Sequence, residues 1–97
     1  MLTSKQRTKL RSIASTTEPI GQIGKSGVTD NLAESVDKAL TARELIKLSV
    51  LKGADETPEF YADELAERTG AEVVCVIGKK LVLYRKSEKE HVEHITL

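Results

Sequence analysis

Two glycines flank a lysine and a serine in the tetrapeptide Gly24-Lys25-Ser26-Gly27. Glycine lets the backbone adopt positive φ angles and approach a ligand closely. The residues that follow predict a helix, and a helix N-terminus presents free N–H groups and a partial positive charge to an anion. Because Lys25 adds an ammonium group, this chemistry suits a phosphate. The same spacing also fits a purely structural turn.

The tetrapeptide differs from the nucleotide-binding glycine motifs. A nucleoside-triphosphate loop needs an earlier glycine at a fixed spacing, and a dinucleotide fingerprint needs Gly-x-Gly-x-x-Gly; the chain has neither. A short Gly-x-x-Gly loop with one lysine suits a sugar-phosphate backbone better. KH domains use such a loop to clamp about four nucleotides. We therefore predict a nucleic-acid backbone, and not a bound nucleotide, as the ligand of residues 24–27.

Basic residues form two further groups. The first predicted helix carries four of them and no acid before Glu18, namely Lys5, Arg7, Lys9 and Arg11. Like charges four residues apart on a helix cost a few tenths of a kcal/mol, so their unbalanced repetition indicates an external anion, although a solvated surface helix would look the same. The second group is Lys79, Lys80, Arg85 and Lys86, of which the first three are predicted RNA contacts. Lys79 and Lys80 occupy a predicted hairpin tip and become relevant only if that tip lies near Lys25.

The formal net charge of zero hides a segregation of charge along the chain. Residues 1–52 contain nine basic and five acidic residues, and residues 53–97 contain six basic and ten acidic residues. A polyanion senses the field within about 8–10 Å of its contact, so local charge matters more than the total. A neutral protein can therefore present one basic face to nucleic acid.

Residues suited to catalysis or metal binding are scarce. Neither Cys75 nor Ser26 has an identifiable histidine partner, so we expect no enzymatic activity and no cofactor. His91 and His94, with Glu90 and Glu93, could share a helix face, but no further ligand set accompanies them and we predict no metal site. With only three aromatic residues in the chain, recognition by several base-stacking platforms is not expected.

The hydrophobic pattern predicts the order α-β-α-β-α-β-β. Helices are expected at 4–15 with Ser4 as its cap, at 29–42 capped by Thr29, and at 57–70 from Thr57 to Gly70; strands are expected at 19–23, 45–51, 71–77 and 81–85. Two strand-helix-strand units imply some parallel pairing, and the last two strands form a hairpin. Phe60, Tyr61 and Leu65 are expected to face the core. Cys75 is expected to be a buried strand residue.

Other features bound the class of protein. A single cysteine excludes an internal disulfide. The N-terminal residues show no signal peptide, and no apolar run is long enough for a membrane span. We therefore expect a cytoplasmic, monomeric protein with one domain at residues 1–86 and a charged tail at residues 87–97.

Five blocks of sequence, in order, resemble the CRM domain family (chloroplast RNA splicing and ribosome maturation). They are residues 2–7, 22–27, 42–47, 76–79 and 81–85. Lys86 stands where many members carry proline after the Tyr-Arg pair. The resemblance implies a four-stranded mixed sheet similar to the C-terminal domain of bacterial translation initiation factor three. It also implies that Gly24 to Gly27 contact RNA with help from surrounding basic residues.

The resemblance to the bacterial single-domain members implies a role in assembly of the large ribosomal subunit. We predict binding to precursor ribosomal RNA through Gly24, Lys25, Ser26 and Gly27, with contacts from the predicted contact residues of the two basic groups. The alternative is a protein-interaction module that docks on ribosomal proteins through the acidic third helix, around Asp63, Glu64 and Glu67.

Overall fold

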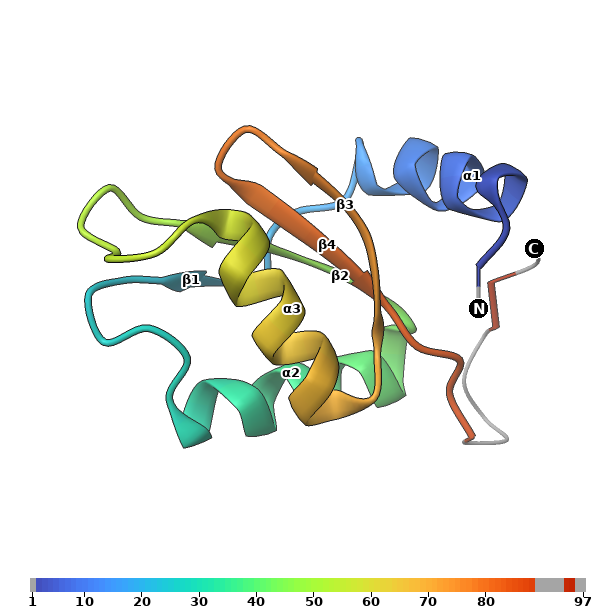
Figure 1. Cartoon of the computed structure of the whole chain (residues 1–97). Coiled ribbons are helices and arrows are strands. Elements are labelled where there is room, and N and C mark those ends of the chain that lie inside the picture. The colour runs from blue at the N-terminus through green and yellow to red at the C-terminus, as the bar shows by residue number, and fades with distance from the viewer. Residues whose placement is uncertain (1, 89–93, 96–97) are drawn as a thin grey trace.

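Four strands form one mixed sheet with helices on both faces (Figure 1). The structure is a computed structural model that describes residues 2–88 and 94–95. The elements are α1 (Ser4–Ala14), β1 (Gly21–Ile23), α2 (Asp30–Arg43), β2 (Leu45–Val50), α3 (Pro58–Thr69), β3 (Glu72–Ile77) and β4 (Lys80–Tyr84). The sheet order is β1-β2-β4-β3, with β1 and β2 parallel and the other pairs antiparallel. The predicted element order and mixed four-stranded sheet are confirmed.

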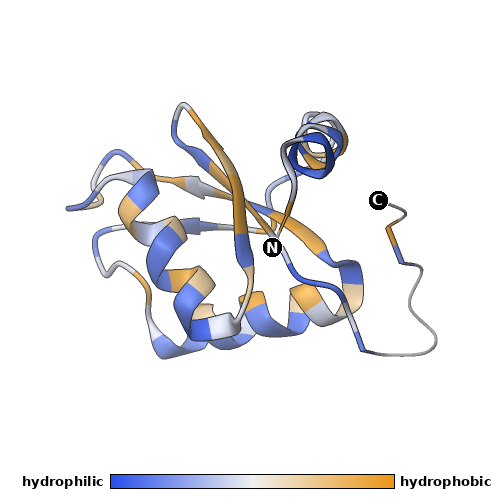
Figure 2. Cartoon of the chain, turned by 45° about the vertical axis from the view of Figure 1, so that its right-hand side comes forward, coloured by the Kyte–Doolittle hydropathy of each residue, from blue (hydrophilic) through white to orange (hydrophobic). Residues whose placement is uncertain are grey.

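The sheet separates two hydrophobic clusters. On one face, α2 and α3 cover residues such as Ile46, Leu48 and Leu83, which are fully buried. On the other face, Leu10 and Ala14 of α1 pack in a smaller cluster with four strand residues, Leu45, Val74, Val82 and Tyr84. Figure 2 shows α1 on one side of the sheet and the other two helices on the opposite side. The central strands β2 and β4 therefore contribute apolar residues to both faces of the sheet, and the face under α1 also carries Lys47, Ser49 and Lys80.

Local side-chain hydrogen bonds begin the helices. Thr29 and Thr57 accept from the backbone N–H groups of Leu32 and Phe60, as predicted for caps. The prediction that Ser4 caps α1 is wrong, because Thr3 is the N-cap residue. Its hydroxyl accepts from the N–H of Gln6 (3.1 Å), whose side chain accepts from the N–H of Thr3 (3.0 Å). A glutamine three residues after the cap completes a capping box, which only Thr3 can form.

Two predicted core positions are more exposed than expected. Tyr61 and Leu65 are buried, but Phe60 is 50% exposed. The buried stripe of α3 consists of Tyr61, Ala62, Leu65 and Thr69, and Phe60 lies outside it, about 100° from Tyr61 on the side away from Ala62. Cys75 is only half-buried, at the margin of the cluster under α1.

No helix among the described residues is both long enough and apolar enough to cross a bilayer.

Candidate nucleic-acid interface

The loop at residues 24–27 is a tight turn between β1 and α2. The N–H of Gly27 donates to the carbonyl oxygen of Gly24 (2.9 Å), and Gly27 has a φ of 64°. Lys25 and Ser26 are exposed at the tip of this turn. A methyl group added to Gly27 would lie 3.6 Å from the Tyr61 ring, so the loop sits against the first turn of α3. The fold thus holds the backbone of the turn while its two central side chains face solvent.

The sheet register brings the β3–β4 hairpin to the same end of the sheet as this turn. Beyond the paired strands, the N–H of Leu51 donates to the carbonyl of Ile23 (2.8 Å), and the N–H of Val50 donates to that of Lys79 (2.7 Å). Gly24 and Lys79 therefore flank β2 on either side. Neighbouring strands lie about 4.8 Å apart, so about 10 Å separates these two backbones. The hairpin tip therefore lies near the start of the loop, and the contact of Lys79 and Lys80 with RNA stays a prediction.

Lys52 belongs to the same end of the molecule and was not singled out from the sequence. It is exposed, directly after Leu51 at the end of β2. Its position between the two predicted contact segments could have been found only from the strand order, because Lys52 lies far from both segments along the chain.

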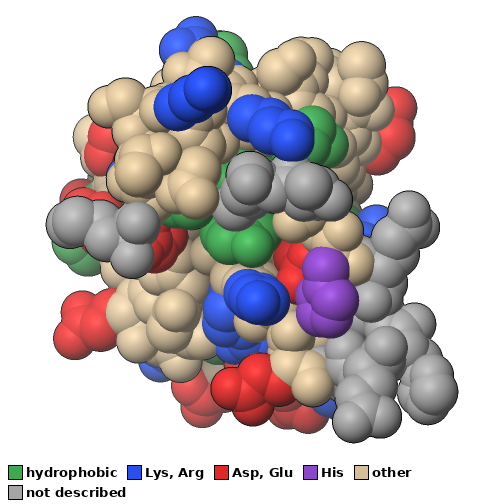
Figure 3. Space-filling model, turned by 90° about the vertical axis from the view of Figure 1, so that its right-hand side faces the viewer, with side chains coloured by type: hydrophobic (Ala, Val, Ile, Leu, Met, Phe, Trp, Pro, Cys, Tyr) green, Lys and Arg blue, Asp and Glu red, His purple; other side chains and the backbone are tan. Residues whose placement is uncertain are grey.

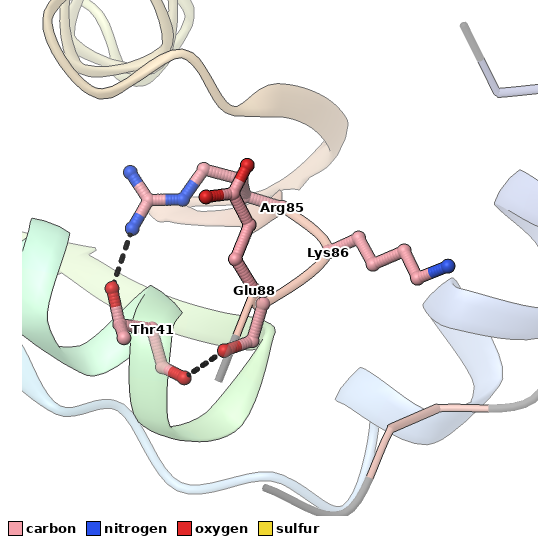
Figure 4. Close-up of a pocket in the computed structure, with 5 residues that line it drawn as sticks. Thr41, Arg85, Lys86 and Glu88 are labelled. Atoms are coloured by element: carbon pink, nitrogen blue, oxygen red, sulfur yellow. Dashed lines mark hydrogen bonds between the residues drawn. The ribbon is translucent and has the colours of Figure 1, made fainter. Parts of the chain in front are cut away.

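Arg85 lies at the opposite end of the sheet, where Tyr84 pairs with Leu45. Its guanidinium group donates to Asp37 Oδ1 (2.6 Å), Thr41 Oγ1 (2.9 Å) and the carbonyl of Thr69 (2.6 Å). Figure 4 shows the contact with Thr41 of α2. Arg85 thus ties α2 to the end of α3, and the structure does not bring it together with the loop. Its contact with RNA stays a prediction.

The four basic residues of α1 fall into two kinds. Arg7 is half-buried, and its guanidinium donates to the carbonyl oxygens of Val73 and Val74 in β3. Lys5, Lys9 and Arg11 are exposed. Figure 3, which faces the α1 and C-terminal end of the molecule, shows Lys and Arg side chains at the top and in the centre of this face, and acidic side chains around its edges. The structure therefore leaves the lysines and Arg11 available to a ligand, whereas Arg7 serves the packing of α1.

Acidic residues gather on the outer side of α3. Glu59, Asp63 and Glu67 are exposed there at four-residue intervals. Glu64 differs because it is half-buried and lies 3.9 Å from the guanidinium of Arg68. The basic helix α1 and the acidic outer side of α3 thus lie on opposite faces of the sheet.

Glu44 is a buried carboxylate to which no motif in the sequence points. It is fully buried between α2 and β2 and has a φ of 66°. It accepts hydrogen bonds from the N–H groups of Ser87 (2.6 Å) and Ile95 (2.6 Å) and from Nδ1 of His94 (2.7 Å). Glycine or asparagine is usual at such a helix end, so a glutamate there could have signalled a special role.

The predicted absence of a metal site concerns the C-terminal tail. Within residues 2–88 and 94–95, no group of three or more potential ligands is placed to hold a metal ion. His94 contacts Glu44, while His91, Glu90 and Glu93 lie outside the described residues.

Comparison with known proteins identifies relatives over nearly the whole chain. A Bacillus subtilis protein named "Probable RNA-binding protein YqeI" is 44% identical over 89 residues, which cover 92% of this chain and 93% of the relative. A Haemophilus influenzae protein named "RNA-binding protein" is 33% identical over 92 residues, covering 95% and 93%.

A solved structure has the same fold. The solution structure of the hypothetical protein SAV1595 from Staphylococcus aureus, for which RNA binding is suggested, matches with a TM-score of 0.78 and 42% identity. The match covers 98% of this chain and all of that one. Residues 2–85 also match the family described as the CRS1 / YhbY (CRM) domain. The chain belongs to the CRS1 / YhbY (CRM) domain family.

Proposed function

We propose that this protein binds RNA at the end of the sheet formed by the Gly24–Gly27 loop and the β3–β4 hairpin, and that it acts on precursor RNA of the large ribosomal subunit. The names of its relatives support RNA as the partner. The observation that carries the proposal is the register that sets the hairpin lysines beside the loop. Cytoplasmic localisation and the absence of catalysis are part of the same proposal.

The chemistry of this end of the sheet fits a phosphate backbone. Exposed Lys25, Lys79 and Lys80 supply positive charge, and α2, whose N-terminus at Asp30 lies just beyond the turn, adds the positive end of a helix dipole. Binding to phosphates releases counterions, so affinity should fall with salt, with a slope of about −0.7 per phosphate contacted on single strands. Lys5, Lys9 and Arg11 of α1 would add longer-range attraction.

Reversing charge at the turn tests the proposal. We expect Lys25→Asp combined with Ser26→Asp to lower RNA affinity at least about tenfold, because each lost charge-assisted contact is worth about 1.5–3 kcal/mol. The matched control is Lys38→Asp with Ser35→Asp, which makes the same change of charge at exposed positions of α2. Binding is measured by filter or gel assay, and circular dichroism verifies folding. Equal affinity of the loop and control variants would remove the loop from the mechanism.

The ribosomal part of the proposal needs a separate experiment. Crosslinking in cells followed by sequencing of the attached RNA should recover precursor large-subunit RNA. Recovery of other RNA classes alone would reject the ribosomal role and leave RNA binding intact.

A protein-docking function is the second candidate. It is favoured by the exposed Phe60 beside the carboxylates of Glu59 and Asp63 on α3. Asp63→Lys with Glu67→Lys should abolish capture of ribosomal proteins if this surface docks them, and should leave RNA affinity unchanged or higher.

A further inference from the structure

Four side chains form a row across the sheet at the end nearest the Gly24–Gly27 loop. Gln22 of β1 pairs with Ser49 of β2, Ser49 pairs with Lys80 of β4, and Lys80 pairs with Ile77 of β3. Paired residues of neighbouring strands point to the same face of a sheet. Their chain neighbours Ile23, Val50 and Leu81 belong to the core under α2 and α3. The row therefore points to the opposite face, which α1 shares.

Helix α1 leaves this row uncovered. Its buried residues pack near the start of β2 and the end of β4, against Leu45 and Tyr84 among others. The last turn of α1 reaches only as far as Lys47, two residues before Ser49 in β2. There, Nζ of Lys47 donates to the carbonyl of Ala14 (3.1 Å). In Figures 1 and 2, α1 lies away from β1 on this side of the sheet.

The side chains of the row are accordingly accessible. Gln22 and Lys80 are exposed, Ser49 is half-buried, and Ile77 is 42% exposed. Gln22 and Ser49 also line a shallow hollow along the edge strand with Pro19, Ile20 and Gly21.

The composition of the row suits an unpaired RNA strand. The Gln22 amide and the Ser49 hydroxyl can donate to and accept from base edges or the ribose 2′-hydroxyl. The Lys80 ammonium group can contact a phosphate, and Ile77 offers an apolar contact for a base. The row contains no carboxylate that would repel the backbone.

Positive charge continues from this row toward α1. Cys75 lies two residues before Ile77 in β3, on the same face of the sheet and one step closer to α1. Burial raises the pKa of the Cys75 thiol, and the positive charges of Arg11, Lys47 and Arg7 oppose that shift. These charges therefore act over the sheet surface next to the row, and exposed Arg11 is available to a phosphate that reaches it.

On the side of the loop next to α3, the exposed charges are negative. The first turns of α3 lie against Gly27 through Tyr61, and they expose Phe60 among Glu56, Glu59 and Asp63. An aromatic ring can stack on a base, but three carboxylates around it repel the phosphates that come with the base. An RNA strand that leaves the loop is thus favoured over the sheet and disfavoured over α3.

We propose that Gln22, Ser49, Lys80 and Ile77 form a second contact surface, on which a single RNA strand continues from the Gly24–Gly27 loop across the sheet toward Arg11. This inference rests on the proposed RNA binding and assigns its path and its further contact residues. The ligand class is unpaired RNA, bound through its backbone and its base edges.

The test uses RNA oligonucleotides of graded length and the isosteric change Gln22→Glu, which places a carboxylate on an exposed edge-strand position. A Gly-x-x-Gly loop clamps about four nucleotides, so the intact protein should gain affinity as the RNA grows beyond that length. Gln22→Glu should leave the shortest RNA unaffected and lower the affinity for long RNA about two- to tenfold, the effect of one hydrogen bond. Lys80 belongs to both surfaces, so Lys80→Glu should lower the affinity for RNA of every length, and most for long RNA. Lys86→Glu, at an exposed position after β4, should leave the affinity for both short and long RNA unchanged.

Phe60→Ala on the other flank is the directional control. Loss of the length-dependent gain in Phe60→Ala but not in Gln22→Glu would overturn the inference and direct the strand over α3. No gain with length in the intact protein would also overturn it. Failure of the proposed function looks different, since Lys25→Asp with Ser26→Asp would then bind every length as the intact protein does.

Discussion

The two loop glycines meet different demands. Gly27 has a φ of 64°, where a residue with a Cβ atom is strained, although the nearest Tyr61 atom would leave ordinary room for a methyl group. Gly24 has no such φ, and a methyl group there would lie 3.6 Å from the Leu51 side chain, an ordinary contact. The fold therefore needs glycine at position 27 for the conformation of the turn. At position 24 the fold has no such need, and the proposed RNA binding would use glycine there for close approach of the phosphate backbone.

Alanine substitution separates these demands. We expect Gly27→Ala to lower the free energy of unfolding by about 1–2 kcal/mol through backbone strain, and Gly24→Ala to change it little. Gly24→Ala should still weaken RNA binding if the backbone of the turn approaches a phosphate. Urea unfolding and a binding assay on both variants provide the measurements. Equal destabilisation by the two substitutions would contradict this division.

Helices and strands are predictable from the sequence where local chemistry determines them. Thr57, Pro58 and Gly70 mark both ends of α3 because a cap, a first-turn proline and a left-handed terminal residue each act within a few residues. Phe60 was misplaced because the sequence does not say which of two adjacent aromatics meets the core. Which predicted contact residues lie near the loop could not be predicted from local sequence, because the strand order decides it. That order sets Lys79 beside the loop and puts Arg85 at the far end of the sheet. Arg7 and Glu44 likewise have partners distant in sequence.

The cap of α1 gives a test at this scale. Thr3→Ala removes the hydroxyl that accepts from the Gln6 N–H and should cost about 1 kcal/mol of stability. Ser4→Ala should be nearly neutral, because Ser4 is exposed and its carbonyl, which accepts from Thr8 Oγ1, is retained. Thermal or urea unfolding of the two variants decides between the caps, and a larger loss for Ser4→Ala would contradict the structure.

At the scale of the whole molecule, Glu44 joins the junction of α2 and β2 to residues near the C-terminus. Its carboxylate binds the backbones of Ser87 and Ile95, while Ile95 also packs against the cluster under α1. Burial by itself raises the pKa of Glu44, but hydrogen bonds from His94, Ser87 and Ile95 together outweigh it and hold the pKa below its ordinary value. The charged form is thus the one that the fold stabilises.

A lowered pKa in the folded state has a defined consequence for stability. The pKa of a glutamate in the unfolded chain is about 4.3. Above that pH the charged Glu44 contributes its full stabilisation of the fold. This contribution is lost as the pH falls through the lower pKa that Glu44 has in the folded state. Glu72, whose pKa is lowered by the N–H of Leu2 against the effect of burial and by the charge of Arg7, adds to the same acid-induced loss. The pH dependence of the wild-type free energy of unfolding therefore does not by itself give the contribution of Glu44.

The variant Glu44→Gln separates the contribution of Glu44 from that of Glu72. A neutral amide loses charge-assisted hydrogen bonds and should lower the free energy of unfolding at pH 7 by roughly 1.5–3 kcal/mol. Below about pH 4.3 the difference from the wild type should narrow, because protonation makes the wild-type side chain neutral too. Urea unfolding across pH 2–7 measures the difference, and Glu72→Gln serves as the control for the second carboxylate. A difference that stays constant with pH would show that the charge of Glu44 does not stabilise its bonds to Ser87, His94 and Ile95.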